Sequence, residues 1–262
     1  MADHLAQRPG VVAVLFYGNL HRDPGAGGLL DLYVLTEGDA AYHGVGLAAL
    51  ANRVLPPNVY HEVLADGPRA KVAVMRLEAF AARMRPLAWD TTLWARFTQP
   101  SALLYALDDR VRAEVLEAIL AAHRSAASWA VALAGPDASS VAAWEALFTH
   151  TYGAELRVEG GGRARMLAER GGALFEMLHA EATPATSDAP RAWALRRRLG
   201  KLLNAARLIK AAFTFRGGLA YALDKVERHS GRPVELSPWE KRHPALAVPF
   251  VVLRLLRERR LR

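Results

Sequence analysis

The hydrophobic pattern of this 262-residue chain changes its period near Leu77, and no other sequence feature constrains the fold as much. Before Leu77, apolar and β-branched runs bounded by Gly, Pro and Asp predict strands. These runs cover 11–17, 29–35, 58–64 and 70–76. After Leu77, apolar residues recur at helical spacing. The segments with that spacing are 77–84, 109–133, 140–150 and 163–178. Strands first and helices afterwards indicate an α+β fold.

Two connections indicate how the early strands pair. The Asp66-Gly67 pair between two alternating apolar runs is a strong signal for a hairpin that joins the third and fourth strands. The polar segment 21–28 separates the first two strands, which we expect to lie side by side. A helix over 46–53 would then pack on a small mixed sheet.

The segment from His179 to Pro190 is the most linker-like part of the chain, because Pro, Thr and Ser replace bulky apolar residues there. It separates the body of the chain from a basic C-terminal part. We therefore predict a mixed-sheet domain over 1–105, a helical domain over 106–185 and a basic helical region over 186–262.

The chain is basic and contains no cysteine. A net charge of +8 and a pI near 10.1 suit a polyanionic partner such as a nucleotide, a nucleic acid or an anionic membrane. Richness in Ala and Arg gives many chains a similar pI without such a partner. The lack of cysteine excludes disulfides, thiolate metal sites and cysteine nucleophiles. No apolar run reaches the ~20 residues of a membrane span and no signal sequence is evident, so we expect a cytoplasmic protein.

Asp31 stands inside an apolar strand, and its position needs an explanation. Its neighbours in "LDLYVL" are Leu, Tyr and Val, and a buried carboxylate without a partner is strongly destabilising. One explanation is an acid at a strand end, hydrogen-bonded to the preceding loop. The other is a functional carboxylate, because the preceding strand ends in a Gly-containing turn, "FYG" at 16–18.

A strand, a Gly turn and a second strand that bears an acid resemble the layout of the nucleotidyltransferase superfamily. In that superfamily the turn brings backbone N–H groups to the nucleotide phosphates, and an Asp-apolar-Asp pattern holds Mg²⁺. This chain is similar at Gly18 and Asp31. It departs from the pattern with Asn19 where Ser is expected and Tyr33 where the second acid is expected.

Further motifs, in the same order along the chain, resemble the mitochondrial-type CDP-diacylglycerol synthases, the translocator assembly and maintenance family. The motifs are "YGNLHRDPGAGGLLDLYVL" from Tyr17, "NVYHEV" from Asn58, "KVAV" from Lys71, "ARFTQPS" from Ala95, "TYGAELR" from Thr151, and Arg207 with "RG" at 216–217. The resemblance covers most of the chain, and the order of the motifs carries it. It implies a nucleotidyltransferase-type mixed sheet with flanking helices, a helical second domain and a basic C-terminal helical tail.

The resemblance also implies roles for individual residues. The residues implied to bind the nucleotide are Tyr17, Gly18, Asn19, Lys71 and Arg96. The residues implied to bind a substrate phosphate are Arg157, Arg207 and Arg216. Asp31 would be the principal Mg²⁺ ligand and, with Lys71, the catalytic pair. A second Mg²⁺ ligand would come from Glu62 on a neighbouring strand or from Glu37.

Some of these residues have simpler explanations. Lys71 could be a solvated residue at a strand edge, and Arg96 could extend over Trp94 or Phe97. Four tryptophans at helical spacing are expected to lie in the core. They are Trp89, Trp94, Trp129 and Trp144.

The C-terminal segment from Ser237 to Arg262 carries an apolar stretch, 246–256, between basic flanks. At about 1.5 Å per residue this stretch covers about half of the ~30 Å hydrocarbon core of a bilayer, so it cannot span one. Trp239 and the basic flanks favour a segment that lies in the interface of an anionic membrane. The alternative is a C-terminal helix that docks on the body and has a solvated basic end.

We therefore predict a peripheral enzyme on the inner face of the cell membrane. It would transfer CMP from CTP to phosphatidic acid with the help of Mg²⁺, giving CDP-diacylglycerol and pyrophosphate, and would have no nucleic acid partner. Two alternatives stay open. One is a nucleotidyltransferase that acts on RNA or a small molecule, and the other is an inactive relative that binds nucleotide or lipid.

Overall fold

The structure is a computed structural model of the chain, and it describes most of the residues. The described ranges are 1–18, 29–64, 69–135, 137–154, 162–214 and 236–242, together with Ala247, Phe250, Val251, Arg254 and Arg257. The side chains at 208, 211–214 and 241 lie outside the description. The predicted Asp66-Gly67 turn also lies outside the described residues.

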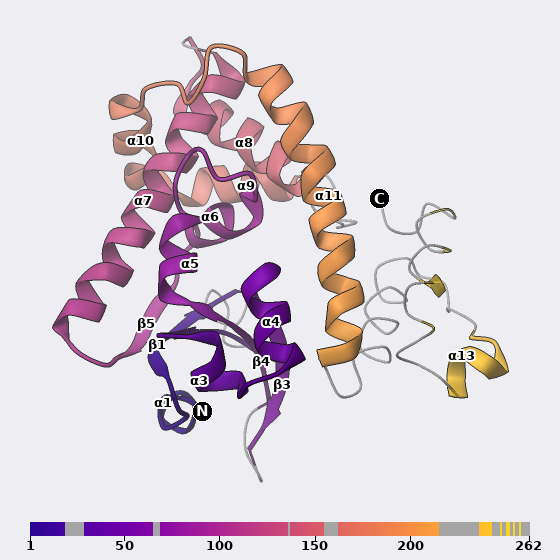
Figure 1. The fold of residues 1–262 in the computed structure, drawn as a ribbon. Helices are drawn as coiled ribbons and strands as arrows, with labels where there is room; N and C mark the ends of the chain where they lie inside the picture. Colours follow the sequence, from indigo (N-terminus) through magenta and orange to yellow (C-terminus); the bar gives the residue numbers. More distant parts are fainter. Residues whose placement is uncertain are drawn as a thin grey trace.

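A five-stranded sheet forms one end of the molecule (Figure 1). Its strands are β1 (Val11–Tyr17), β2 (Leu30–Thr36), β3 (Asn58–Val63), β4 (Arg69–Arg76) and β5 (Ala102–Ala106). Their order across the sheet is β3-β4-β2-β1-β5. β2 and β4 are parallel while the other neighbours are antiparallel, so the sheet is mixed. The predicted α+β fold with a mixed sheet is confirmed.

The edge strand β5 was not predicted. Its sequence, Ala-Leu-Leu-Tyr-Ala, contains no β-branched residue and is too short to show a clear period. The strand forms because it pairs antiparallel with β1, where Ala13 faces Ala106 and Phe16 faces Ala102. Tertiary pairing therefore determines the structure of this segment, and its local sequence does not.

The two faces of the sheet carry different cores, because side chains alternate along each strand. On one face, Leu15, Tyr33 and Met75 join a large hydrophobic cluster that continues through the helices. On the other face, Leu32 and Val72 pack with Leu5 in a smaller cluster. We refer to these as the helical face and the outer face of the sheet. Alternate residues along each strand therefore belong to the helical face and to the outer face in turn.

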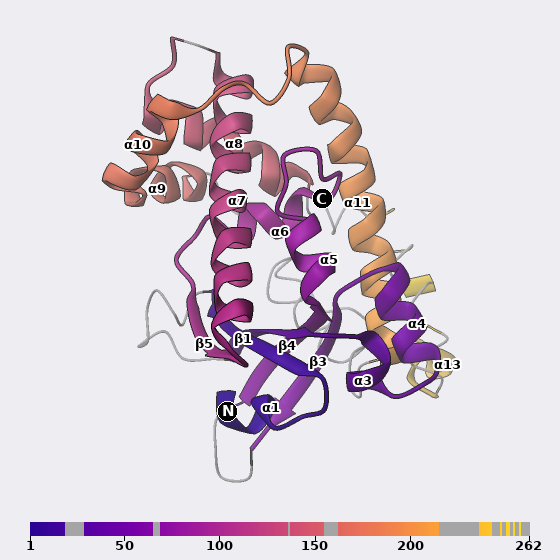
Figure 2. The same cartoon turned by 60° about the vertical axis from the view of Figure 1, so that its left-hand side comes forward.

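Helices cover the sheet and extend away from it (Figures 1 and 2). The helices that flank the strands are α1 (Ala2–Ala6), α3 (Asp39–His43), α4 (Leu47–Val54), α5 (Leu77–Ala82) and α6 (Thr91–Phe97). Those that follow the sheet are α7 (Asp109–Ala134), α8 (Ser140–Ala154), α9 (Arg163–Arg170), α10 (Gly172–Glu181), α11 (Ala189–Thr214) and α13 (Pro238–Arg242). The predicted helices before the C-terminal region are present with one correction.

The segment 163–178 was predicted as a single helix and forms two. Gly171 and Gly172 separate α9 from α10, and Gly172 has a positive φ of 49°. A Cβ atom at Gly171 would lie 1.8 Å from the Phe175 ring, so the chain bends where only glycine fits. The apolar spacing continues through the break, which is why the pattern did not reveal it.

Three of the four tryptophans predicted in the core are buried. Trp94, Trp129 and Trp144 have exposed fractions of 0–1%. The prediction for Trp89 was wrong, since this residue is 53% exposed. Trp89 lies in the connection before α6. The guanidinium of Arg196 lies over its ring, with Cζ of Arg196 5.4 Å from the Trp89 ring centroid.

The long helix α11 connects the two ends of the molecule. It packs on α8 at the helical end and reaches β3 at the sheet end, as the orange helix in Figure 1 shows. Its C-terminal residues Arg207 and Lys210 therefore lie beside the sheet although they are remote from it in sequence. The large cluster includes side chains from the sheet and from the helices between 109 and 193.

The C-terminal segment is described only in part. Within it, α13 carries Trp239, whose ring centroid lies 6.0 Å from that of Phe250. Both side chains are exposed. No helix in the described part of the chain is long and apolar enough to cross a membrane.

Candidate functional site

A row of four side chains crosses the helical face near one end of the strands. Tyr17 on β1 faces Asp31 on β2, Asp31 is the register partner of Lys71 on β4, and Lys71 faces His61 on β3. Register partners point to the same face of a sheet. Because Tyr17 belongs to the large cluster, the whole row lies on the helical face. The structure thus brings together Tyr17, Asp31 and Lys71, which were predicted to share a site.

Gly18 ends β1 and lies directly against Asp31. Its φ is +91°, a conformation that L side chains rarely adopt. A Cβ atom built on Gly18 would lie 2.6 Å from Oδ2 of Asp31. Only glycine therefore allows the chain to leave β1 at this angle beside the carboxylate.

Tyr33 follows Asp31 on the same face and takes the position of the second acid in the superfamily pattern. It is 1% exposed, and its ring contacts those of Tyr17, Phe80 and Phe97 at centroid distances of 5.3–6.3 Å. Burial raises the pKa of the Tyr33 hydroxyl, while the charges of Arg96 and Arg207 and a hydrogen bond from Arg96 act in the opposite direction. This position is part of the aromatic core, with its hydroxyl turned toward cations.

Arg96 on α6 reaches the same part of the helical face. Its Cζ lies 5.4 Å from the ring centroid of Tyr17. It therefore extends over the ring of Tyr17. Arg96 is thus next to the row that contains Tyr17 and Asp31.

Arg207 comes to the site from α11. It forms an ion pair with Asp90 and donates through Nε to the Pro56 carbonyl at 3.0 Å. The two side chains of the ion pair are 16% and 11% exposed. Burial alone would raise the pKa of Asp90, but the charge of Arg207 and hydrogen bonds from Arg207 and Thr92 hold it below its usual value.

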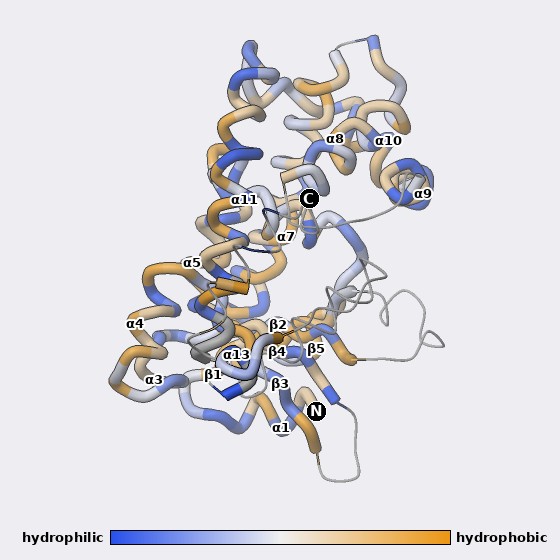
Figure 3. The backbone as a smooth tube through the Cα atoms, turned by 90° about the vertical axis from the view of Figure 1, so that its right-hand side faces the viewer, coloured by the Kyte–Doolittle hydropathy of each residue, from blue (hydrophilic) through white to orange (hydrophobic). Residues whose placement is uncertain are grey.

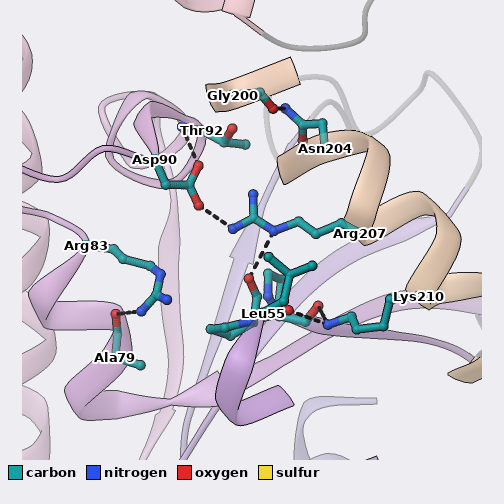
Figure 4. Close-up of polar contacts among 11 residues, drawn as sticks. Leu55, Ala79, Arg83, Asp90, Thr92, Gly200, Asn204, Arg207 and Lys210 are labelled. Carbon is teal, nitrogen blue, oxygen red and sulfur yellow. Dashed lines mark hydrogen bonds and ion pairs between the residues drawn. The ribbon is translucent and has the colours of Figure 1, made fainter. Parts of the chain in front are cut away.

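Two further cations accompany Arg207 (Figure 4). Lys210 donates to the carbonyl oxygens of Leu55 and Pro57. Arg83 follows α5 and donates to the Ala79 carbonyl at 3.1 Å. Neither residue was predicted from the sequence. Lys210 could have been found, because it follows Arg207 by three positions and residues with this spacing share one face of a helix.

The structure does not bring Glu62 together with Asp31. Glu62 is next to His61 on β3, and since His61 shares the helical face with Lys71, Glu62 points to the outer face. There it forms a bidentate ion pair with Arg8, with distances of 2.7 and 2.9 Å. The expectation that Glu62 completes a metal site with Asp31 is therefore wrong. Glu37 follows the far end of β2, opposite to the end that carries Asp31.

Three predicted site residues lie outside the described part of the chain. They are Asn19, Arg157 and Arg216. Their roles stay predictions.

The donor set around Asp31 limits the kind of metal site that is possible. Within the described residues no group of three or more His, Asp or Glu side chains could hold a metal ion. Mg²⁺ in nucleotide sites is often held by one or two carboxylates together with substrate phosphates and water. The described residues fit that arrangement, with Asp31 as the protein ligand, and do not fit a site with two metal ions held by several carboxylates.

Comparisons with known proteins leave the family open. No protein-family model and no curated protein matches the sequence. A solved structure of a nucleotidyltransferase-like protein from Exiguobacterium sibiricum 255-15 aligns with 98% of this chain and 88% of its own. Its sequence identity is 12% and the TM-score is 0.28, which does not establish a common fold.

Proposed function

We propose that this protein is a nucleotidyltransferase whose nucleotide site is formed by Gly18, Asp31, Lys71 and Arg96. The observation that carries the proposal is the close approach of Gly18 to the Asp31 carboxylate, where a Cβ atom would lie 2.6 Å from Oδ2. A glycine beside a strand carboxylate lets an anionic ligand approach the backbone closely, next to an Asp that could bind Mg²⁺.

Each residue of the site has a role that follows from its chemistry. Lys71 is a compact cation one strand away from Asp31 and would neutralise the triphosphate. Arg96 presents a planar guanidinium that can bind phosphate with two parallel hydrogen bonds. Asp31 would hold a Mg²⁺ ion that enters with the triphosphate, and this ion would neutralise phosphate charge when bound.

The reaction we propose is the transfer of CMP from CTP to phosphatidic acid. An oxygen of the lipid phosphate would attack the α-phosphorus of CTP, the bond from that phosphorus to the β-phosphate oxygen would break, and pyrophosphate would leave. Such a reaction depends on positioning and on cations rather than on covalent chemistry of the protein. Support for this acceptor comes from the resemblance of the ordered motifs to the CDP-diacylglycerol synthases.

An exposed apolar surface supports a lipid substrate. Four large side chains in and before α4 are exposed, namely Val45 (99%), Leu47 (85%), Leu50 (57%) and Val54 (73%). We refer to them as the α4 patch, and Figure 3 colours much of α4 as hydrophobic. Clustered exposed apolar side chains mark contacts with membranes or proteins. The carbonyl groups that bind Arg207 and Lys210 follow α4 directly, at Leu55, Pro56 and Pro57.

Purified protein should release pyrophosphate from CTP in the presence of Mg²⁺ and vesicles that contain phosphatidic acid. Asp31→Ala should abolish this release, and Asp137→Ala, which changes an exposed acid between α7 and α8, should not affect it. Release that persists in Asp31→Ala would disprove the mechanism. A matched reaction with UTP, ATP and GTP would establish the base preference.

A second candidate is a protein that binds the nucleotide without turnover. It is favoured by Tyr33, whose buried aromatic ring occupies the position of the second acid, and by Lys71, a cation next to the only acid of the row. In that case CTP should bind and the release of pyrophosphate should be absent with every acceptor, including RNA. Binding of RNA that weakens steeply with salt would instead favour a nucleic acid substrate.

A further inference from the structure

The helix α11 carries most of the net charge of the chain. It contains seven Arg and Lys residues and neither Asp nor Glu, so it accounts for all but one of the eight net positive charges. Three of its cations lie on the side that faces the body of the protein, namely Arg196, Arg207 and Lys210. The other four are exposed, and they are Arg191, Arg197, Arg198 and Lys201.

The exposed side chains of α11 follow one face of the helix. Positions 191, 195, 198 and 202 recur at spacings of three and four residues, which places their side chains on the same face. Leu195 and Leu202 are 44% and 67% exposed on this face, between the cations. We refer to the exposed residues as the α11 surface, and they are Arg191, Leu195, Arg197, Arg198, Lys201 and Leu202.

Packing on the opposite side of the helix fixes the direction of the α11 surface. Trp193 is 3% exposed, and its ring centroid lies 5.3 Å from that of Trp129. Gly200 lies against α8, where a Cβ atom would lie 2.8 Å from the Ala154 carbonyl oxygen. Rotation of α11 about its axis would break both contacts. The exposed leucines therefore stay directed outward.

The cations of the α11 surface have few acids beside them. Arg191 forms an ion pair of 3.4 Å with Asp188, which precedes the helix. Among the residues that the structure describes, Arg197, Arg198 and Lys201 form no ion pair with a carboxylate. Several like charges on one helix face produce a positive field that extends into the solvent. Such a field suits an extended anionic partner.

The side chains between the cations favour a lipid surface over a nucleic acid. Proteins that bind single strands add aromatic side chains that stack on the bases, and the described part of α11 exposes none, because Trp193 is buried. Leu195 and Leu202 instead place aliphatic groups between cations, as in segments that lie in a membrane interface. The α4 patch lies on the same side of the molecule (Figures 2 and 3), where Lys210 of α11 donates to the carbonyl of Pro57.

We propose that the α11 surface binds the anionic headgroups of a phospholipid membrane. Its cations would meet lipid phosphates while its leucines reach the headgroup region. None of these residues belongs to the row of Tyr17, Asp31, Lys71 and His61, which lies on the strands. The proposal therefore does not depend on the reaction that we propose for that row.

The test is the binding of the full-length protein to vesicles, measured by co-sedimentation at low and at high salt. Vesicles of phosphatidylcholine are compared with an equimolar mixture of phosphatidylcholine and phosphatidylglycerol, an anionic lipid that is not the proposed substrate. The wild type should bind the mixed vesicles, and more weakly as salt screens the charges. The double variant Arg198→Gln with Lys201→Gln should bind them at least about tenfold more weakly, since each cation near an anionic surface changes the affinity by about fivefold.

A matched control removes two exposed cations from another side of the molecule. Arg110 and Arg112 of α7 have side chains that are 76% and 55% exposed, and Figure 1 shows α7 and α11 on different sides. The double variant Arg110→Gln with Arg112→Gln changes the net charge by the same amount and should bind the mixed vesicles like the wild type. Glutamine is a good helix former, and circular dichroism would confirm that both double variants are folded.

The proposal is wrong if the wild type does not bind the mixed vesicles, or if the α11 variant binds them as tightly as the wild type does. An equal loss of affinity in the control would also overturn it, because net charge alone would then drive the binding. Binding of the wild type to a duplex RNA but not to vesicles, with loss of RNA binding in the α11 variant, would assign the surface to nucleic acid instead.

CTP binding in the absence of vesicles separates this proposal from the proposed function. Both double variants should bind CTP like the wild type, because the exchanged residues lie outside the candidate nucleotide site. Vesicle binding that depends on Arg198 and Lys201, in a protein that does not bind CTP, would refute the nucleotide site and support the α11 surface.

Discussion

Asp90 and Arg207 are 117 positions apart in the chain and form an ion pair that fixes the end of α11 to the start of α6. Asp90 has a second function, since its Oδ1 accepts a hydrogen bond from the Thr92 N–H and caps α6. The same carboxylate therefore orders the helix that carries Arg96 and positions Arg207, which was predicted to bind a substrate phosphate. Two parts of the candidate site depend on this one side chain.

Asp90→Asn should separate these two functions, because Asn caps helices about as well as Asp does but cannot form the ion pair. We expect the free energy of unfolding to fall by about 2 to 3 kcal/mol at pH 7. The ion pair lowers the pKa of Asp90 in the folded state, so its stabilisation is complete above the unfolded pKa of about 3.9 and is lost as the pH falls through the folded value. Urea unfolding between pH 2.5 and 7 measures both effects.

The stability difference between the wild type and Asp90→Asn should therefore shrink as the solution becomes more acidic. A difference that stays constant from pH 7 to pH 2.5 would show that the carboxylate charge does not contribute. Asp90→Ala is the matched comparison, since it also removes the cap and should cost about 1 kcal/mol more at every pH.

Gly18→Ala tests the close approach of Gly18 to Asp31. The substitution places a Cβ atom 2.6 Å from Oδ2 of Asp31 at a φ of +91°. We expect the free energy of unfolding to fall by about 1 to 2 kcal/mol, the cost of a left-handed conformation for alanine. CTP affinity should fall by more than the change in stability explains, because the carboxylate must move. Isothermal titration with CTP and Mg²⁺ measures this loss.

Gly38→Ala provides the control for that experiment. Gly38 has an extended backbone with φ of −159°, and a Cβ atom there would meet nothing within 4 Å. It should bind CTP like the wild type. Equal CTP affinity in Gly18→Ala would mean that Gly18 is not part of a nucleotide site.

Most of the fold could be predicted from the sequence because its elements have strong local patterns. Examples are the buried apolar runs of β1, β2 and β4 and the helical spacing of apolar residues that continues through the long helix α7. β5 could not be predicted, since its structure depends on pairing with β1. The separation of α9 and α10 was also missed, because two glycines interrupt a pattern whose apolar spacing continues.

The order of the motifs along the chain predicted part of the site. The direction of a side chain within a strand and the contacts between distant elements were not predicted. Asp31 and Lys71 were assigned to one site, and they are register partners. Glu62 was assigned to the same site and lies on the other face, because one residue of offset reverses the direction of a side chain in a strand. The position of Arg83 near Arg207 follows from the packing of α11, which no local pattern encodes.

Lys210→Met should alter how stability depends on pH. Burial and the charge of Arg207 lower the pKa of Lys210 to about 7, with Asp39 acting in the opposite direction. The unfolded chain, with a lysine pKa near 10.4, therefore binds more protons than the folded protein between pH 7 and 10. Stability from this group should rise with pH across that window.

The measurement is the thermal midpoint of the wild type and of Lys210→Met from pH 6 to 9.5. The wild type should gain stability relative to the variant as the pH rises above 7. Lys201→Met, which changes an exposed lysine of the same helix, should follow the wild type. Parallel curves for all three proteins would show that Lys210 keeps an ordinary pKa.

Leu47→Asp tests whether the α4 patch contacts lipid. Leu47 is 85% exposed, so a charge there should leave the fold and its stability nearly unchanged. Burial of a leucine side chain contributes about 1.5 to 3 kcal/mol, and binding to vesicles that contain phosphatidic acid should weaken by at least about tenfold if this residue enters the membrane. Leu87→Asp changes a leucine of similar exposure, 79%, in the connection between α5 and α6, and should bind these vesicles like the wild type. Co-sedimentation of the three proteins with vesicles measures this difference. Equal binding by all three would mean that the α4 patch faces a protein or solvent, and that a lipid substrate reaches the site by another route.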